Sequence, residues 1–100
     1  MTYGLSEITL EKIRSILGRH PEVDKAMLYG SRAKGNYKNG SDIDLTLHGQ
    51  DLTQRTLAKI ADELDDLLLP YTIDLSIFEQ LTDPDFIDHI QRVGSVFYEK

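Results

Sequence analysis

Three aspartates are the residues of this sequence best suited by type and spacing to chemistry. Asp42 and Asp44 open a segment of alternating polar and apolar residues, and Asp74 has the same place in a second such segment. Three carboxylates at close range repel one another and raise one another's pKa values unless a cation lies among them. Mg²⁺ favours carboxylate oxygens together with water and substrate phosphates, and two such ions about 4 Å apart can clamp a phosphoryl displacement. The aspartates therefore predict a magnesium site that acts on a phosphate substrate.

A basic, glycine-rich segment precedes the first two aspartates. Gly30 would let the backbone approach a phosphate closely, and Ser31 with the amides that follow it would donate hydrogen bonds to that phosphate. Arg32 and Lys34 would add positive charge. Segment 31–41 has no acidic residue, although acidic residues outnumber basic ones 17 to 11 in the whole chain. This segment is the candidate phosphate-binding loop.

Hydrophobic periodicity predicts the elements that position these residues. Three helices are indicated by apolar residues at helical spacing, with polar caps before them and glycine or proline after them. Three strands are indicated by a short apolar run and by two segments of period-2 alternation. The aspartates lie on the polar face of the two alternating strands. The expected helices run from Ser6 to Gly18, from Thr53 to Pro70 with Leu67 and Leu68 inward, and from Asp83 to Gly94; the expected strands are Lys25–Tyr29, 42–48 and 72–78, with one helical turn at 31–34 and a last strand or irregular segment at 96–98.

The order of these elements predicts an α/β domain of the α+β kind, with one small sheet and helices packed mainly on one face. The strand–helix–strand unit 42–78 should be a right-handed crossover, which makes its two strands parallel and places the three aspartates at the same end. If the first strand is antiparallel to the second, its end brings Gly30 and Ser31 to that same corner. The loop and the carboxylates would then form one site.

Composition sets limits on the partners. One hundred residues that are 40% hydrophobic predict a single domain over residues 1–100. The longest apolar run, Leu67-Leu68-Leu69, is far shorter than the roughly 20 residues of a membrane span, and the first residues lack the layout of a signal peptide, so we expect a cytoplasmic protein without a membrane partner. A net charge of −6 disfavours direct nucleic-acid binding through phosphate contacts alone.

Other phosphate and metal motifs do not fit the spacing. A Walker A loop that starts at Gly30 would need lysine at position 36, which is Asn36. The histidines His20, His48 and His89 lack the spacing of metal ligands, and we expect each at the surface or at an edge. The three aspartates and the loop remain the candidate site.

The motif as a whole resembles a known family. Leu28-Tyr29-Gly30-Ser31-Arg32-Ala33-Lys34-Gly35, followed by Ser41-Asp42-Ile43-Asp44-Leu45, resembles the signature of the polymerase-beta-type nucleotidyltransferase superfamily, and Ile73-Asp74-Leu75 matches the family's third carboxylate. In length the chain is similar to the minimal nucleotidyltransferase (MNT) proteins, which pair with a helical HEPN-domain protein. The resemblance covers nearly the whole chain and implies the nucleotidyltransferase fold.

The resemblance also implies roles for the site residues. Gly30 and Ser31 would contact the phosphates of a nucleoside triphosphate, with ATP as the expected substrate, and Asp42 and Asp44 would hold Mg²⁺. Asp74 would complete the metal site or accept a proton from the attacking hydroxyl. MNT proteins that pair with HEPN toxins resemble antitoxins that attach AMP to a tyrosine of the partner. The expected function is therefore magnesium-dependent AMP transfer to a HEPN-type helical partner.

Two other functions stay open at the level of sequence. The chain could be the catalytic subunit of a two-chain small-molecule nucleotidyltransferase, or a neutraliser that binds its partner sterically and uses nucleotide only as a structural ligand. Larger relatives resemble this chain with a helical domain added, so we expect a separate protein to supply the acceptor or to close the cleft. The apolar residues at 93 and 96–98 would contact that protein or simply cover the sheet.

Overall fold

A four-stranded mixed sheet forms the centre of the computed structural model, which describes residues 2–38 and 42–100. The strand order is β3-β2-β1-β4, and β2 runs parallel to β3 while β1 is antiparallel to both β2 and β4. Both predicted pairings, the parallel crossover and the antiparallel first strand, are confirmed. The strands are β1 (Lys25–Tyr29), β2 (Ile43–His48), β3 (Ile73–Ile77) and β4 (Ser95–Glu99).

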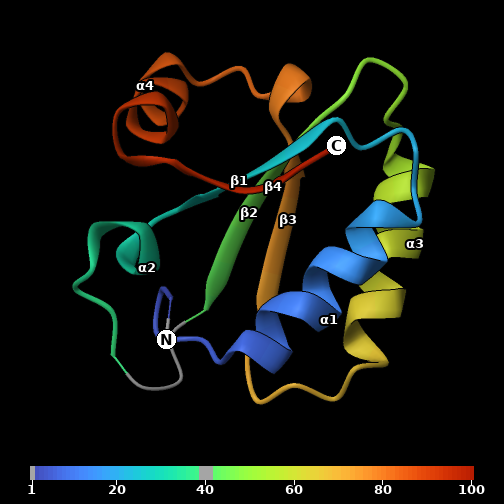
Figure 1. Cartoon of the computed structure of the whole chain (residues 1–100). Helices are drawn as coiled ribbons and strands as arrows, with labels where there is room; N and C mark the ends of the chain where they lie inside the picture. Colours follow the sequence, from blue (N-terminus) through green and yellow to red (C-terminus); the bar gives the residue numbers. More distant parts are fainter. Residues whose placement is uncertain (1, 39–41) are drawn as a thin grey trace.

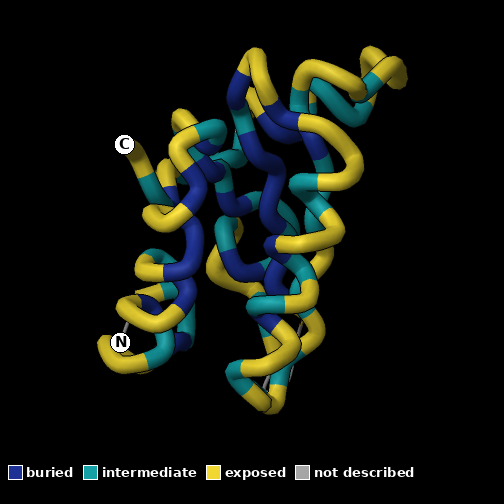
Figure 2. Tube along the Cα trace, turned by 90° about the vertical axis from the view of Figure 1, so that its right-hand side faces the viewer, coloured by how far each residue is buried: buried dark blue, intermediate teal, exposed yellow. Residues whose placement is uncertain are grey.

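The two long helices, α1 (Glu7–Gly18) and α3 (Gln54–Asp65), cover one face of the sheet, as Figure 1 shows. The short α2 (Ser31–Lys34), the 3₁₀ turn η1 (Phe78–Gln80) and α4 (Pro84–Val93) complete the described chain, with α2 and α4 drawn on the other side of the sheet. Figure 2 shows the buried segments running through the middle of the molecule. The core includes the alternate strand residues Ala26, Leu28, Ile43, Leu45, Leu47 and Ile77 and the helix residues Leu10, Ile13, Leu17, Ile60 and Leu64.

The three long helices begin where their polar residues predict. The side chains of Ser6 and Thr53 accept hydrogen bonds from backbone amides three residues later, each at 3.2 Å. Asp83 accepts from the amide of Asp85 at 3.0 Å, with Pro84 at the start of the helix. These caps satisfy donors that the first helical turn leaves without partners, which explains the sharp starts. The segment after α4 is resolved as a strand, β4, at the edge of the sheet.

The predicted length of the second long helix is wrong. It ends at Asp65 instead of continuing to Pro70, and Leu68, predicted to point inward, is 88% exposed. The amides of Leu67 and Leu68 bond to carbonyls only three residues back, so the chain tightens after the helix. Leu68 then adopts a left-handed backbone with φ of 56°, which turns its side chain away from the core.

The described residues contain no helix that is both long and apolar enough to cross a membrane.

Candidate active site

Asp44 and Asp74 are direct neighbours across the parallel strands. Asp44 lies opposite Asp74 of β3 and opposite Tyr29 of β1, so the three side chains form one row across the sheet. Successive residues of a strand point to opposite faces, and the flanking Ile43 and Leu45 are completely buried under the helices. The row therefore lies on the face away from α1 and α3, as the alternation predicts.

The electrostatics of Asp44 are those of a crowded carboxylate. Partial burial raises its pKa above the ordinary value of 3.8, and the charges of Asp74 and then Asp42 raise it further. The carboxyls of Asp44 and Asp74 also share a hydrogen bond, which favours the protonated form of Asp44. Ionising this carboxyl in the bare protein is therefore less favourable than ionising a free carboxyl, and a bound cation would oppose that shift.

Gly30 brings the end of β1 against this carboxylate. Its backbone has φ of 80° and ψ of −156°, a region that is essentially restricted to glycine. A Cβ atom at this position would lie 2.5 Å from Asp44 Oδ2, closer than any real contact. The missing side chain therefore has two causes, the backbone conformation and the close approach to Asp44.

The remaining predicted residues of the site lie at varying distances from this pair. Ser31 opens α2 directly after Gly30 and is half-buried, whereas Lys34 at the end of α2 is exposed. Asp42 lies one residue before β2 and is exposed. Residues 39–41 of the predicted loop lie outside the described residues. Within the described ranges, no group of three or more His, Asp or Glu side chains is gathered closely enough to hold a metal ion.

Arg32 does not lie where the sequence predicts. It was expected to offer its charge to a phosphate, but it is 3% exposed. Its Nη1 donates to the carbonyl oxygen of Tyr3 at 2.8 Å, and its guanidinium lies against the rings of Tyr37 and Tyr71. Hydrophobic periodicity cannot predict this burial, because residues that enclose Arg32 come from segments distant along the chain. The prediction that Arg32 offers its charge to the phosphates is not supported by its position, because its guanidinium is enclosed by protein.

A row of hydroxyl groups next to the carboxylates was missed by sequence reasoning. Ser76 donates to Thr46 Oγ1 at 2.9 Å, and Ser76 also hydrogen-bonds to the hydroxyl of Tyr29. Burial raises the pKa of Tyr29, and the charges of Asp44 and Asp74 raise it further, so the phenol stays protonated. All three hydroxyl residues occupy polar-face positions of their strands, so the alternation that placed the aspartates could also have placed them.

The histidines are structural in different ways. His20, expected at the surface or an edge, is 8% exposed, and its Nε2 lies 2.7 Å from Glu63 Oε2 on α3. The prediction is wrong for His20, because its side chain packs against α3 through this contact with Glu63. His48, at the far end of β2 from Asp44, has its ring stacked on Phe78 with centroids 4.4 Å apart.

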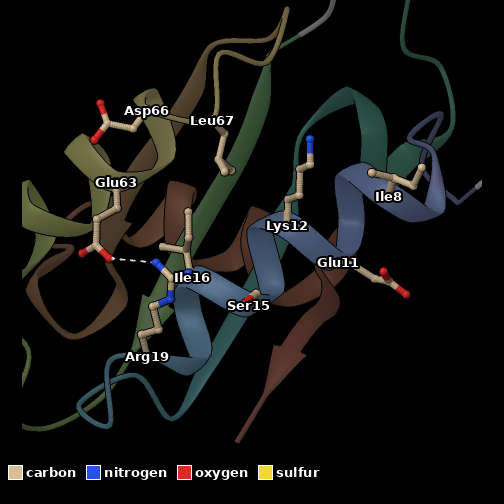
Figure 3. A pocket seen from close by; sticks show the side chains of 9 residues that line it. All are labelled: Ile8, Glu11, Lys12, Ser15, Ile16, Arg19, Glu63, Asp66 and Leu67. Atoms are coloured by element: carbon tan, nitrogen blue, oxygen red, sulfur yellow. Dashed lines mark ion pairs between the residues drawn. The ribbon is translucent and has the colours of Figure 1, made fainter.

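A hollow of about 490 Å³ lies between α1 and α3, on the opposite side of the sheet from the carboxylates. Figure 3 shows its lining, in which Arg19 reaches Glu63 across the groove at 3.8 Å. Ile16 and Leu67 are among its apolar lining residues, and its charged groups come from both helices and the residues that directly follow them. Its lining does not include the acidic pair or the glycine turn, so we assign the chemistry to the corner at Asp44.

The donor set at that corner fits a magnesium ion. Carboxylate oxygens are the ligands that Mg²⁺ prefers, and the like charges of Asp44 and Asp74 are unfavourable without a cation. Asp42 contributes a third negative charge from the start of β2. Asp44 and Asp74, in register across the strands, are the residues at this corner that would hold the ion, and Asp42 stays the predicted third ligand.

The fold is thus a mixed sheet with two helices on one face, an acidic pair on the other and a glycine turn against that pair. The family model of polymerase beta nucleotidyltransferases matches residues 11–100. The chain belongs to this family and is a nucleotidyltransferase. No curated protein sequence matches it.

Solved structures share this fold. A toxin–antitoxin complex with AMP-PNP is similar at 22% identity and a TM-score of 0.73, over 91% of this chain and 73% of that one. A tri-AMPylated Shewanella oneidensis HEPN toxin in complex with MNT antitoxin is similar at 18% identity and a TM-score of 0.70, over 96% of this chain and 74% of that one. The toxin–antitoxin complex MntA-HepT is similar at 18% identity and a TM-score of 0.69, over 95% of this chain and 74% of that one. At these identities the similarity establishes the common fold.

Proposed function

We propose that this chain transfers AMP from ATP to a tyrosine hydroxyl of a HEPN-type helical partner and thereby acts as an antitoxin in the cytoplasm. The observation that carries the chemistry is the Asp44–Asp74 pair in register across parallel strands, with Gly30 packed against Asp44. The choice of partner is supported by the two similar structures that are MNT–HEPN complexes, one of them with an AMPylated toxin.

The reaction assigns a role to each residue at this corner. The acceptor oxygen forms a bond to the α-phosphorus while the bond to the β-phosphate oxygen breaks, and pyrophosphate leaves. The backbone of Gly30 and the hydroxyl of Ser31 hold the triphosphate, and Lys34 adds positive charge near it. Magnesium, held by the three aspartates, would offset negative charge on the phosphate oxygens. Asp74 accepts the proton of the acceptor hydroxyl or serves only as a metal ligand.

Transfer of label from ATP to the partner tests this proposal. The chain is incubated with Mg²⁺, a candidate HEPN-type partner protein, and ATP labelled at either the α- or the γ-phosphate. We expect the α-label alone to appear on the partner, and to be absent when EDTA is added or when Asp44→Asn replaces the wild type. Peptide mapping should place the AMP on tyrosine.

The same experiment separates the other functions. Label on a small-molecule acceptor with none on protein would show a two-chain small-molecule transferase. Neutralisation of the partner by a variant lacking all three aspartates would show steric neutralisation. Either result would overturn the proposed AMP transfer to protein.

A further inference from the structure

The buried guanidinium of Arg32 joins three segments that are distant along the chain. Its Nη1 donates to the Tyr3 carbonyl of the N-terminal turn at 2.8 Å. Its central carbon lies 5.3 Å from the ring centroid of Tyr37, after α2, and 4.8 Å from that of Tyr71, before β3. The N-terminal turn packs so closely on Tyr37 that a Cβ atom at Gly4 would collide with its ring. Arg32 therefore lies in a tightly packed junction.

This junction supports a helix that is too short to be stable alone. Helix α2 has only four residues, and a single helical turn is unfavourable because it fixes several residues for few hydrogen bonds. Its closing bonds run from the amide of Lys34 to the carbonyl of Gly30 at 3.1 Å and from Gly35 to Ser31 at 3.0 Å. Arg32 is the buried residue of α2. The conformation of the Gly30-Ser31 turn thus depends on the anchoring of Arg32.

The junction also fixes this turn relative to the acidic strands. Tyr71, which lies against Arg32, precedes Asp74 by three residues. The next residue, Thr72, accepts a hydrogen bond from the amide of Ile43 at 2.9 Å, which ties the segment to the start of β2. Moving Arg32 would therefore shift α2 relative to both strands that carry aspartates.

We propose that Arg32 is a positioning residue, whose buried guanidinium holds the Gly30-Ser31 turn beside the Asp44–Asp74 pair so that the turn can take the nucleotide phosphates. This inference rests on the proposed function, which assigns the turn to those phosphates. Charge alone does not suffice for the role, because lysine lacks the planar fork that bonds a carbonyl and stacks on two rings. Arg32 acts through Ser31 and Gly30 and does not touch the nucleotide.

Arg14 provides a matched control. Its Nε donates to the Phe97 carbonyl at 2.8 Å and its guanidinium lies 5.2 Å from the Phe97 ring, so it uses the same chemistry at the edge strand β4. In the protein without ligands, Arg32→Lys should speed amide hydrogen exchange at Lys34 and Gly35 about tenfold, the factor for a loss of about 1.4 kcal/mol. Arg14→Lys should leave those two amides unchanged. Equal exchange in both variants would overturn the proposal.

ATP affinity, measured by calorimetry with Mg²⁺, gives the second readout. We expect Arg32→Lys and Tyr71→Leu each to weaken ATP binding about tenfold, and Arg14→Lys to leave it unchanged at a similar loss of thermal stability. Weaker binding in Arg32→Lys with unchanged binding in Tyr71→Leu would overturn positioning in favour of direct contact. If Arg32→Lys does not fold, Tyr71→Leu decides alone. A wild type that binds no ATP would instead refute the proposed function. The amide hydrogen exchange of Lys34 and Gly35 would then still test the role of Arg32.

Discussion

The polar face of β2 has opposite electrostatic designs at its two ends. At the first end Asp44 has the negative charges of Asp74 and Asp42 as neighbours, which raise its pKa. At the other end, His48 lies 3.6 Å from a carboxylate oxygen of Glu79 and stacks on Phe78, and its pKa is lowered by burial and then by Lys25, while Glu79 opposes the shift. At the histidine end the neighbouring charges of Lys25 and Glu79 have opposite signs. At the aspartate end the described charges that shift the pKa of Asp44 are all negative, and such a cluster favours a bound cation over a purely structural role.

The largest expected difference between the two ends is in transfer activity, after one ionisable side chain is replaced at each end. We expect Asp44→Asn to reduce AMP transfer by at least about a thousandfold while preserving the fold, because a metal ligand and several kcal/mol of charge stabilisation are lost. His48→Gln, on the same strand and face, should retain transfer within a few-fold. Initial rates of α-label transfer measure both. Substantial turnover by Asp44→Asn would contradict its role as a metal ligand.

Two glycines separate backbone strain from crowding at the aspartate end. Gly30→Ala should lose transfer activity and stability, since it combines strain of about 1–3 kcal/mol with a collision against Asp44. Gly35 has a similar positive φ of 84°, but a Cβ atom added there would lie in open space. Gly35→Ala should therefore lower the free energy of unfolding by only about 1–2 kcal/mol. Urea denaturation and transfer rates compare them. Equal effects of the two substitutions would show that the contact with Asp44 is unimportant.

Loss of one hydroxyl in the turn should have a smaller effect. Ser31→Ala should weaken ATP binding about tenfold, as expected for a hydrogen bond to a charged group, with little change in the rate at saturating ATP. Ser15→Ala, on the exposed face of α1, is the control. The KM and kcat for ATP are the measurements. An unchanged KM in Ser31→Ala would remove Ser31 from the site.

The smallest expected effect is a pH dependence of opposite sign at the two ends, measured in EDTA. Asp44 has a raised pKa in the fold, so the folded state binds more protons and stability should fall as pH rises above about 3.8. His48 has a lowered pKa, so the unfolded state binds more protons and stability should fall as pH drops below about 6.5.

Thermal denaturation of Asp44→Asn and His48→Gln against pH resolves the two contributions. Asp44→Asn should gain stability relative to wild type as pH rises from about 4, and His48→Gln should gain as pH falls below about 6.5. Added Mg²⁺ should raise the melting temperature of the wild type but not that of Asp44→Asn, because binding to the folded state stabilises it. Trends of the same sign in both variants would contradict the comparison.

Local sequence patterns were sufficient for much of this fold. Period-2 alternation placed Asp44 and Asp74 on one face because the strand backbone itself turns successive side chains to opposite sides. Ser6 and Thr53 marked helix starts because a cap acts within one turn. The right-handed crossover rule then made β2 and β3 parallel and brought the two aspartates side by side.

Contacts between distant segments decided the rest. The burial of Arg32 depends on Tyr3 and Tyr71, which are far from it along the chain on either side, and no local pattern connects them. The early end of α3 at Asp65 likewise reflects how the chain must turn to reach β3, where propensity alone favours a longer helix. The sequence by itself determined which face Asp44 and Asp74 share, because that depends on near neighbours along each strand. Only the tertiary structure decided that Gly30 touches Asp44 and that Arg32 is enclosed, because close approach depends on how whole elements pack.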